Sequence, residues 1–142
     1  MIANSNAHSV KVRILIVDDS ALLRQQLRRL LQQNPHWEVC GESEDGREAV
    51  QKTRELNPDL IVMDFAMPQM NGVEAAREIT KSSPELPILM FTMYMSNQLV
   101  DEAKGSGIRG AVDKNEAGKV VKGIEALLRG ESFFDGAGAS TK

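Results

Sequence analysis

Residues 14–19 read ILIVDD, four apolar residues followed directly by two acidic ones. A similar order recurs at residues 60–64, which read LIVMD, four apolar residues followed by one acidic residue. An uninterrupted apolar run of this length is typical of a strand that is covered by helices on both faces. The acidic residues would then stand where the strands end. The two stretches together predict an α/β protein with polar chemistry at one edge of its sheet.

The rest of the chain alternates two patterns. Further short apolar runs lie at residues 37–40, 88–91 and 108–112, and stretches with helical spacing lie between the runs. The breaks between the expected elements hold four prolines, at residues 35, 58, 84 and 87, and two glycines, at residues 105 and 107, as helix ends and turns require. Strands that alternate with helices in this way imply a parallel sheet with right-handed crossovers. A ligand would bind outside the carboxyl ends of such strands.

Length and composition limit the possible organisation. The chain has 142 residues, which suits one domain with a proper core and is too short for two ordinary ones. We expect a flexible N-terminal extension at residues 1–10, a domain at residues 11–130, and a flexible tail or linker stub at residues 131–142. The net charge of −3 argues against direct nucleic-acid binding. The one cysteine, Cys40, has no internal disulfide partner, which suits a reducing cytoplasm.

Neither a membrane span nor a secretory signal is expected. No apolar run approaches the ~18 residues that a transmembrane helix needs. The first residues of the chain are mixed and polar, and they lack the apolar middle of a signal peptide.

Five polar residues stand at the ends of the expected strands. Asp18 and Asp19 follow the first apolar run, Asp64 follows the third, Thr92 the fourth and Lys114 the fifth. Three carboxylates at one edge repel one another, and without a counter-charge one of them would stay protonated. All-oxygen ligands favour a hard cation, and Mg2+ commonly binds through a few carboxylates, water and phosphate. We therefore expect a Mg2+ site at this edge.

The same residues suit phosphoryl transfer. One carboxylate can act as the nucleophile and form an acyl phosphate. The ammonium of Lys114 and the hydroxyl of Thr92 can take the remaining phosphoryl oxygens, because catalysis of this transfer is mostly positioning and charge neutralisation. Each residue alone has a plainer interpretation, since acids after strands often cap helices and lysines are often solvated. Their convergence favours the chemical interpretation.

These motifs resemble the receiver domain of bacterial two-component signalling. The resemblance covers about residues 11–130 and rests on ILIVDDS at 14–20, DFAMPQMNG at 64–72, FTM at 91–93 and GAVDK at 110–114. It implies a flavodoxin-like fold, a five-stranded parallel doubly wound sheet in the order 2-1-3-4-5 with helices on both faces. That order is a known property of the family, because the pattern of the chain alone leaves the order open.

The resemblance also implies roles for the residues. Asp64 would accept a phosphoryl group from a histidine kinase or a phosphotransfer protein, Lys114 would pair with that group, and Thr92 would move toward it. The implied Mg2+ ligands are Asp18, Asp19, Asp64 and the backbone carbonyl of Ala66. Such a protein is not a classical enzyme, but it catalyses its own phosphorylation and dephosphorylation. Phosphorylation would change the surface formed by residues 99–103, 108–112 and 120–128. The same surface could also form a homodimer.

Two positions depart from the family pattern. Ala111 stands three residues before Lys114, where receivers commonly carry a Tyr or Phe ring that turns inward on activation. Asn115 follows the lysine where many receivers have a cis proline, and a non-proline cis bond costs about 3 kcal/mol, so we expect a trans bond. The signal would then pass through backbone and helix movement. Tyr94 either supplies an aromatic group from another direction or is a partly exposed loop residue.

Some interpretations stay open. The FTM run and LRGESFF at residues 128–134 are similar to receivers that precede a LuxR-type helix-turn-helix domain, so the chain is either a stand-alone receiver or a segment of a longer protein. Arg24, Arg28 and Arg29 make either a kinase-docking face or a solvated face.

Three other functions compete with the receiver. The first is an unphosphorylated receiver-like protein-binding module. Such a module would lack some of the acids or the lysine, but all of these residues are present here. The second is an enzyme on a similar sheet, either a magnesium-dependent phosphatase, which needs an Asp where Ala66 stands, or a flavin-binding protein; a glycine-rich phosphate loop after the first strand is also absent. The third is direct nucleic-acid binding, which the acidity of the chain disfavours.

Overall fold

The computed structural model describes residues 10–134. Its five strands are all parallel and lie in the order β2-β1-β3-β4-β5, which confirms the expected topology. The strands are β1 (Val12–Val17), β2 (Trp37–Ser43), β3 (Leu60–Met63), β4 (Ile88–Thr92) and β5 (Gly110–Asp113). The helices are α2 (Ala21–Leu31), α3 (Gly46–Leu56), α4 (Gly72–Ser82), α5 (Asn97–Gly105) and α6 (Lys119–Leu128), with a short 3-10 helix at Lys114–Glu116.

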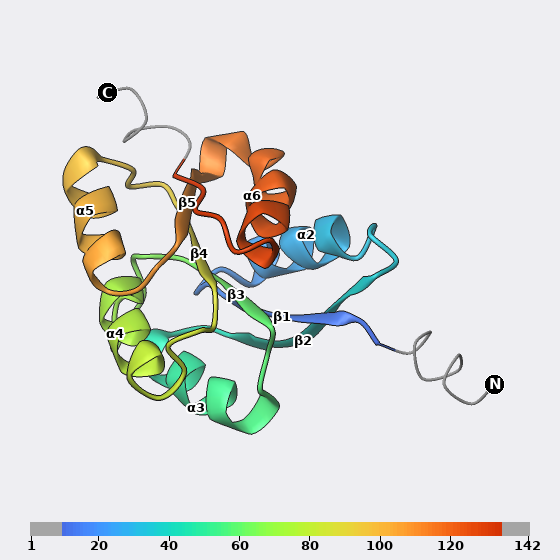
Figure 1. Cartoon of the computed structure of the whole chain (residues 1–142), viewed down its shortest axis with the longest axis horizontal. Coiled ribbons are helices and arrows are strands. Elements are labelled where there is room, and N and C mark those ends of the chain that lie inside the picture. Colours follow the sequence, from blue (N-terminus) through green and yellow to red (C-terminus); the bar gives the residue numbers. More distant parts are fainter. Residues whose placement is uncertain (1–9, 135–142) are drawn as a thin grey trace.

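Helices cover both faces of the sheet (Figure 1). The α2 and α6 helices pack on one face, while α3, α4 and α5 pack on the other. Side chains of β1 alternate between the two cores, so Ile14 and Ile16 face α2 and α6 while Leu15 and Val17 face the opposite side. Every residue of β3 and β4 is buried, which explains why these strands read as continuous apolar runs.

No helix within residues 10–134 is both long enough and apolar enough to span a bilayer.

Side-chain caps hold the loops at the carboxyl edge of the sheet, because the helices begin there. Ser20 caps α2 by accepting a hydrogen bond from the backbone N–H of Leu23. Asn71 and Glu74 form a capping box at the start of α4. The residues between β1 and α2, and between β3 and α4, are therefore held between a buried strand and a capped helix. This placement fixes the two acidic loops of the site.

The chain beyond α6 continues as an ordered segment along the edge strand β5. The backbone N–H of Phe133 donates to the carbonyl of Arg109 (3.0 Å), and its carbonyl accepts from the N–H of Ala111 (2.8 Å). Phe133 also forms a parallel bridge with Gly110, where a Cβ would lie 2.7 Å from the Phe133 carbonyl oxygen. Only glycine permits this close approach. We call residues 131–134 the C-terminal strap.

The strap corrects the expected domain boundary. A flexible tail was expected from residue 131, but residues 131–134 belong to the folded domain because the free edge of β5 offers them hydrogen bonds. Of the other residues expected to be flexible, 1–10 and 135–142, the structure describes Val10 alone, and residues 1–9 and 135–142 lie outside its described part.

Candidate functional site

The carboxyl ends of β1, β3 and β5 bring three acids and a lysine together. Asp18, Asp19 and Asp64 each offer a carboxylate oxygen, and these oxygens lie within 4.8 Å of one another. The Nζ atom of Lys114 lies 2.8 Å from Asp18 Oδ2 and 3.0 Å from Asp64 Oδ2. Asp18 and Asp64 are buried while Asp19 is exposed. The cluster therefore opens to solvent on the side of Asp19.

Backbone amides orient the two buried carboxylates. Asp18 Oδ1 accepts from the N–H of Ser20 (2.9 Å), and Asp64 Oδ1 accepts from the N–H of Phe65 (2.7 Å). The second oxygen of each carboxylate contacts Lys114. Because both oxygens of each group have a partner, the two side chains are held in defined positions without any added ligand.

Burial and charge shift the protonation of the site. Burial raises the pKa of Asp64, and hydrogen bonding to Lys114 offsets only part of this rise. Burial works in the opposite direction on Lys114, but its hydrogen bonds to Asp18 and Asp64 outweigh it and raise the pKa of the ammonium. One ammonium thus pairs with the two buried carboxylates, and the exposed carboxylate of Asp19 lies beside them without such a contact in the described part of the chain. A divalent cation would supply the missing positive charge.

The loop after β3 depends on a glycine. Gly72 begins α4 and donates its N–H to the carbonyl of Phe65 (2.8 Å). A Cβ at this position would lie 2.3 Å from the backbone oxygen of Asp64, so only glycine lets α4 approach the strand end so closely. In the same loop Gln69 has a φ of 71°, which is uncommon outside glycine. The Ala66 carbonyl lies in this loop, and its role as a metal ligand stays a prediction.

Thr92 ends β4 at the same edge of the sheet and is fully buried. Its Oγ1 accepts a hydrogen bond from the N–H of Tyr94 (3.1 Å), which links it to the loop before α5. Tyr94 is 62% exposed, which agrees with its interpretation as an exposed loop residue. Ala111 is completely buried. Within residues 10–134 all peptide bonds are trans, including the bond between Lys114 and Asn115.

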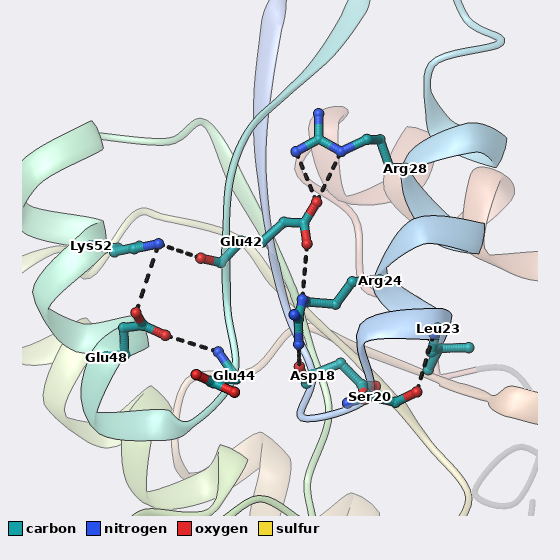
Figure 2. Close-up of polar contacts among 9 residues, drawn as sticks. All are labelled: Asp18, Ser20, Leu23, Arg24, Arg28, Glu42, Glu44, Glu48 and Lys52. Atoms are coloured by element: carbon teal, nitrogen blue, oxygen red, sulfur yellow. Dashed lines mark hydrogen bonds and ion pairs between the residues drawn. The ribbon is translucent and has the colours of Figure 1, made fainter.

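The arginines of α2 are not a uniformly solvated face. Arg24 and Arg28 both bind the carboxylate of Glu42 on β2, as Figure 2 shows, while Arg29 is exposed. The two arginines lower the pKa of Glu42 although burial opposes the shift. No sequence pattern indicates this pairing, because Glu42 lies 18 residues after Arg24 on a different element. For Arg24 the solvated interpretation is therefore wrong.

The family of the chain follows from comparison with known proteins. The sequence profile described as "Response regulator receiver domain" matches residues 14–125. This chain is a response-regulator receiver domain. It is 35% identical over 125 residues to the response regulator protein VraR of Staphylococcus aureus, covering 87% of this chain and 60% of VraR. It is 30% identical over 132 residues to the transcriptional regulatory protein DegU of Brevibacillus brevis, covering 92% and 56%. The receiver thus spans less than two thirds of these relatives.

Solved structures agree with this assignment. A two-component response regulator of the LuxR family from an Aurantimonas species matches with a TM-score of 0.88 and 34% identity, covering 92% of this chain and 94% of that one. The response regulator domain of CheB from Thermotoga maritima matches with a TM-score of 0.73 and 33% identity, covering 84% and 92%. The receiver fold and the similarity to LuxR-family receivers that the motifs indicated are both confirmed.

Proposed function

We propose that this receiver accepts a phosphoryl group on Asp64 from the phosphohistidine of a histidine kinase or a phosphotransfer protein, with Mg2+ bound beside it. The observation that carries the proposal is the cluster of Asp18, Asp19 and Asp64 with Lys114 between the two buried acids. Family membership supports the partner class, because receivers of two-component systems work with kinases.

The donor set fits Mg2+. The cluster is made of carboxylates alone, and small hard cations prefer oxygen ligands. Asp18, Asp19 and Asp64 would hold the ion together with the carbonyl of Ala66. When bound, Mg2+ would neutralise the carboxylates and attract the oxygens of the incoming phosphoryl group.

Asp64 is the nucleophile in this proposal. A carboxylate oxygen forms a bond to phosphorus while the bond from phosphorus to the histidine nitrogen breaks, and the electron pair of that bond stays on the nitrogen. Lys114 already lies 3.0 Å from Asp64 and can follow the phosphoryl oxygens. Thr92 accepts the N–H of Tyr94 and keeps its own hydroxyl proton, which it can donate to a phosphoryl oxygen.

Phosphorylation then acts as a switch. It adds about −1.5 to −2 charges and three acceptor oxygens at Asp64. A movement of Thr92 toward these oxygens carries the Tyr94 loop with it and alters the surface of α5, β5 and α6. The shift between the two states is limited by how differently each state holds the phosphoryl group. With Ala111 in place of a ring, the movement passes through backbone and helix. The same surface is our candidate for a homodimer.

The deciding experiment is incubation of the chain with Mg2+ and acetyl phosphate, followed by intact-mass measurement. We expect one labile phosphoryl adduct on the wild type and none on Asp64→Asn. Asp59→Asn is the matched control, because Asp59 lies at the opposite end of β3 and accepts a hydrogen bond from the N–H of Arg13. No adduct from any donor, together with no Mg2+ binding, would favour an unphosphorylated protein-binding module instead.

A further inference from the structure

One guanidinium links the acidic cluster to the neighbouring strand β2 (Figure 2). Arg24 donates from Nη1 to the backbone carbonyl of Asp18 (2.6 Å) and from Nε to Glu42 Oε1 (2.8 Å). Its side chain is only 17% exposed. We propose that Arg24 is a positioning residue of the Mg2+ site, which it orients through the backbone between Asp18 and Asp19 without touching the ion. The inference rests on the function proposed above and adds a residue to it.

The contact with Asp18 fixes the orientation of a peptide plane. The carbonyl of Asp18 and the N–H of Asp19 belong to one planar unit, so holding the carbonyl also directs the start of Asp19. On the other side, the N–H of Asp18 donates to the carbonyl of Ser43 (3.0 Å). The end of β1 is therefore anchored before and after Asp18.

Asp19 depends on this anchoring more than the other two acids do. Lys114 and backbone amides hold the carboxylates of Asp18 and Asp64. Asp19 is exposed, and no hydrogen bond or ion pair to its carboxylate is present within residues 10–134. The position of its side chain is thus set by the backbone alone. Arg24 holds that backbone before Asp19 through the carbonyl of Asp18, and the Asp18 carboxylate holds it after Asp19 through the N–H of Ser20.

Glu42 holds Arg24 in place and balances its charge. Its carboxylate binds Arg24 at 2.8 Å through one oxygen and Arg28 at 2.8 Å through the other. The backbone carbonyl of Glu42 accepts a hydrogen bond from Lys52 of α3. Contacts from helices on both faces of the sheet therefore fix Glu42, and its negative charge keeps the Arg24 guanidinium from repelling a nearby cation.

Two roles for Arg24 predict opposite changes in Mg2+ affinity. If only its charge mattered, removing the charge would strengthen the binding of a divalent cation, because like charges repel. If Arg24 positions the backbone, its removal weakens binding, because the Asp19 carboxylate loses its orientation. Residues that orient metal ligands typically change metal affinity about 10- to 100-fold when mutated. The sign of the change therefore separates the two roles.

The test measures Mg2+ affinity of the whole chain by calorimetry, and phosphorylation by acetyl phosphate separately. We expect Arg24→Gln to weaken Mg2+ binding about 10-fold and to need a correspondingly higher Mg2+ concentration for phosphorylation. Arg28→Gln is the matched control. Arg28 pairs with the same carboxylate of Glu42 as Arg24 does, but it does not contact Asp18. The Mg2+ affinity of Arg28→Gln should therefore stay within about twofold of the wild type.

Further measurements show whether a loss of Mg2+ binding comes from misfolding. Thermal unfolding without metal checks that Arg24→Gln is folded, and Arg24→Met, which keeps the apolar stem of the side chain, is a second variant with the same expected loss. In the metal-free state the amide NMR resonance of Asp19 should shift in either Arg24 variant and stay in place in Arg28→Gln.

The outcomes keep the two proposals apart. Binding of Mg2+ by folded Arg24→Gln that is as tight as in the wild type, or tighter, would overturn the role of Arg24 and leave the phosphorylation proposal intact. A wild type that neither binds Mg2+ nor accepts a phosphoryl group would overturn the proposed function itself.

Discussion

Lys114 reaches from the end of β5 across β4 to Asp64, and its ammonium lies 3.0 Å from the carboxylate. The same ammonium lies 2.8 Å from Asp18. One cation therefore joins the ends of three strands, and it already stands where a phosphoryl group on Asp64 would need a positive charge. The ammonium that holds these strand ends together is therefore the one that the proposed phosphorylation would also use.

The first prediction concerns Lys114→Gln. At pH 7 the metal-free variant should lose about 3 kcal/mol of unfolding free energy, because two buried carboxylates are left without their cation. The loss should be smaller at pH 5 than at pH 7, because the raised pKa of Asp64 brings protonation of that buried carboxyl closer to the lower pH. The pKa of Lys114 is also raised, so its contribution is complete below the usual lysine pKa and is lost only as the pH rises through the higher value.

Urea unfolding at the two pH values measures the effect of Lys114→Gln. Lys122→Gln, an exposed lysine of α6, is the control and should change stability by less than about 0.5 kcal/mol. Equal losses for the two variants would contradict a central role for Lys114.

The second prediction concerns Asp64→Asn. Without metal at pH 7 this variant should be more stable than the wild type by about 1 kcal/mol, because it removes a buried negative charge next to Asp18. A raised folded pKa means that the folded chain holds its proton more tightly than the unfolded chain. The advantage of the variant should therefore decrease as the pH falls through that pKa.

Chemical unfolding of both proteins across this pH range tests the prediction for Asp64. Mg2+ should reverse the order, since an ion at 100 times its dissociation constant adds about 2.7 kcal/mol to the protein that binds it. A pH-independent difference between the two proteins would count against the raised pKa of Asp64.

The third prediction concerns Gly72→Ala. The new Cβ would lie 2.3 Å from the backbone oxygen of Asp64, so either α4 or the end of β3 must move. We expect a loss of about 3 kcal/mol, at the upper end of overpacking costs, and weaker Mg2+ binding because Asp64 is displaced. Gly105→Ala is the matched control, because a Cβ there meets nothing within 4 Å and alanine favours a helix. Similar behaviour of the two variants would refute the steric argument.

The residues of the site can be predicted from the sequence, whereas the contacts that hold them in place cannot. Asp18, Asp64 and Lys114 were predictable because apolar runs mark the strands and each residue follows one of them. The ion pair of Arg24 with Glu42 was not predictable, because a contact between a helix and a strand depends on their packing, which no local sequence pattern indicates. The strand order came from family resemblance, since alternating strands and helices fit several orders.

The C-terminal strap was missed for a related reason. The segment after Gly130 has no periodicity of its own, and only the free edge of β5 gives it hydrogen-bond partners. The carbonyl of Phe133 covers the N–H of Ala111, which would otherwise be an open position on an edge strand. The strap therefore lies beside the surface that we propose for switching and dimer formation.

The fourth prediction follows for Phe133→Ala. The half-buried ring packs with the core between the sheet and α6, so its loss should cost about 2 kcal/mol. The strap should then detach more often, and the amide of Ala111 should exchange faster with solvent. Hydrogen exchange resolved by NMR measures this directly, with the exposed Ser132→Ala as the control that leaves the exchange unchanged. If the Ala111 amide stays equally protected in Phe133→Ala, the backbone bonds alone hold the strap and the ring contributes nothing to it.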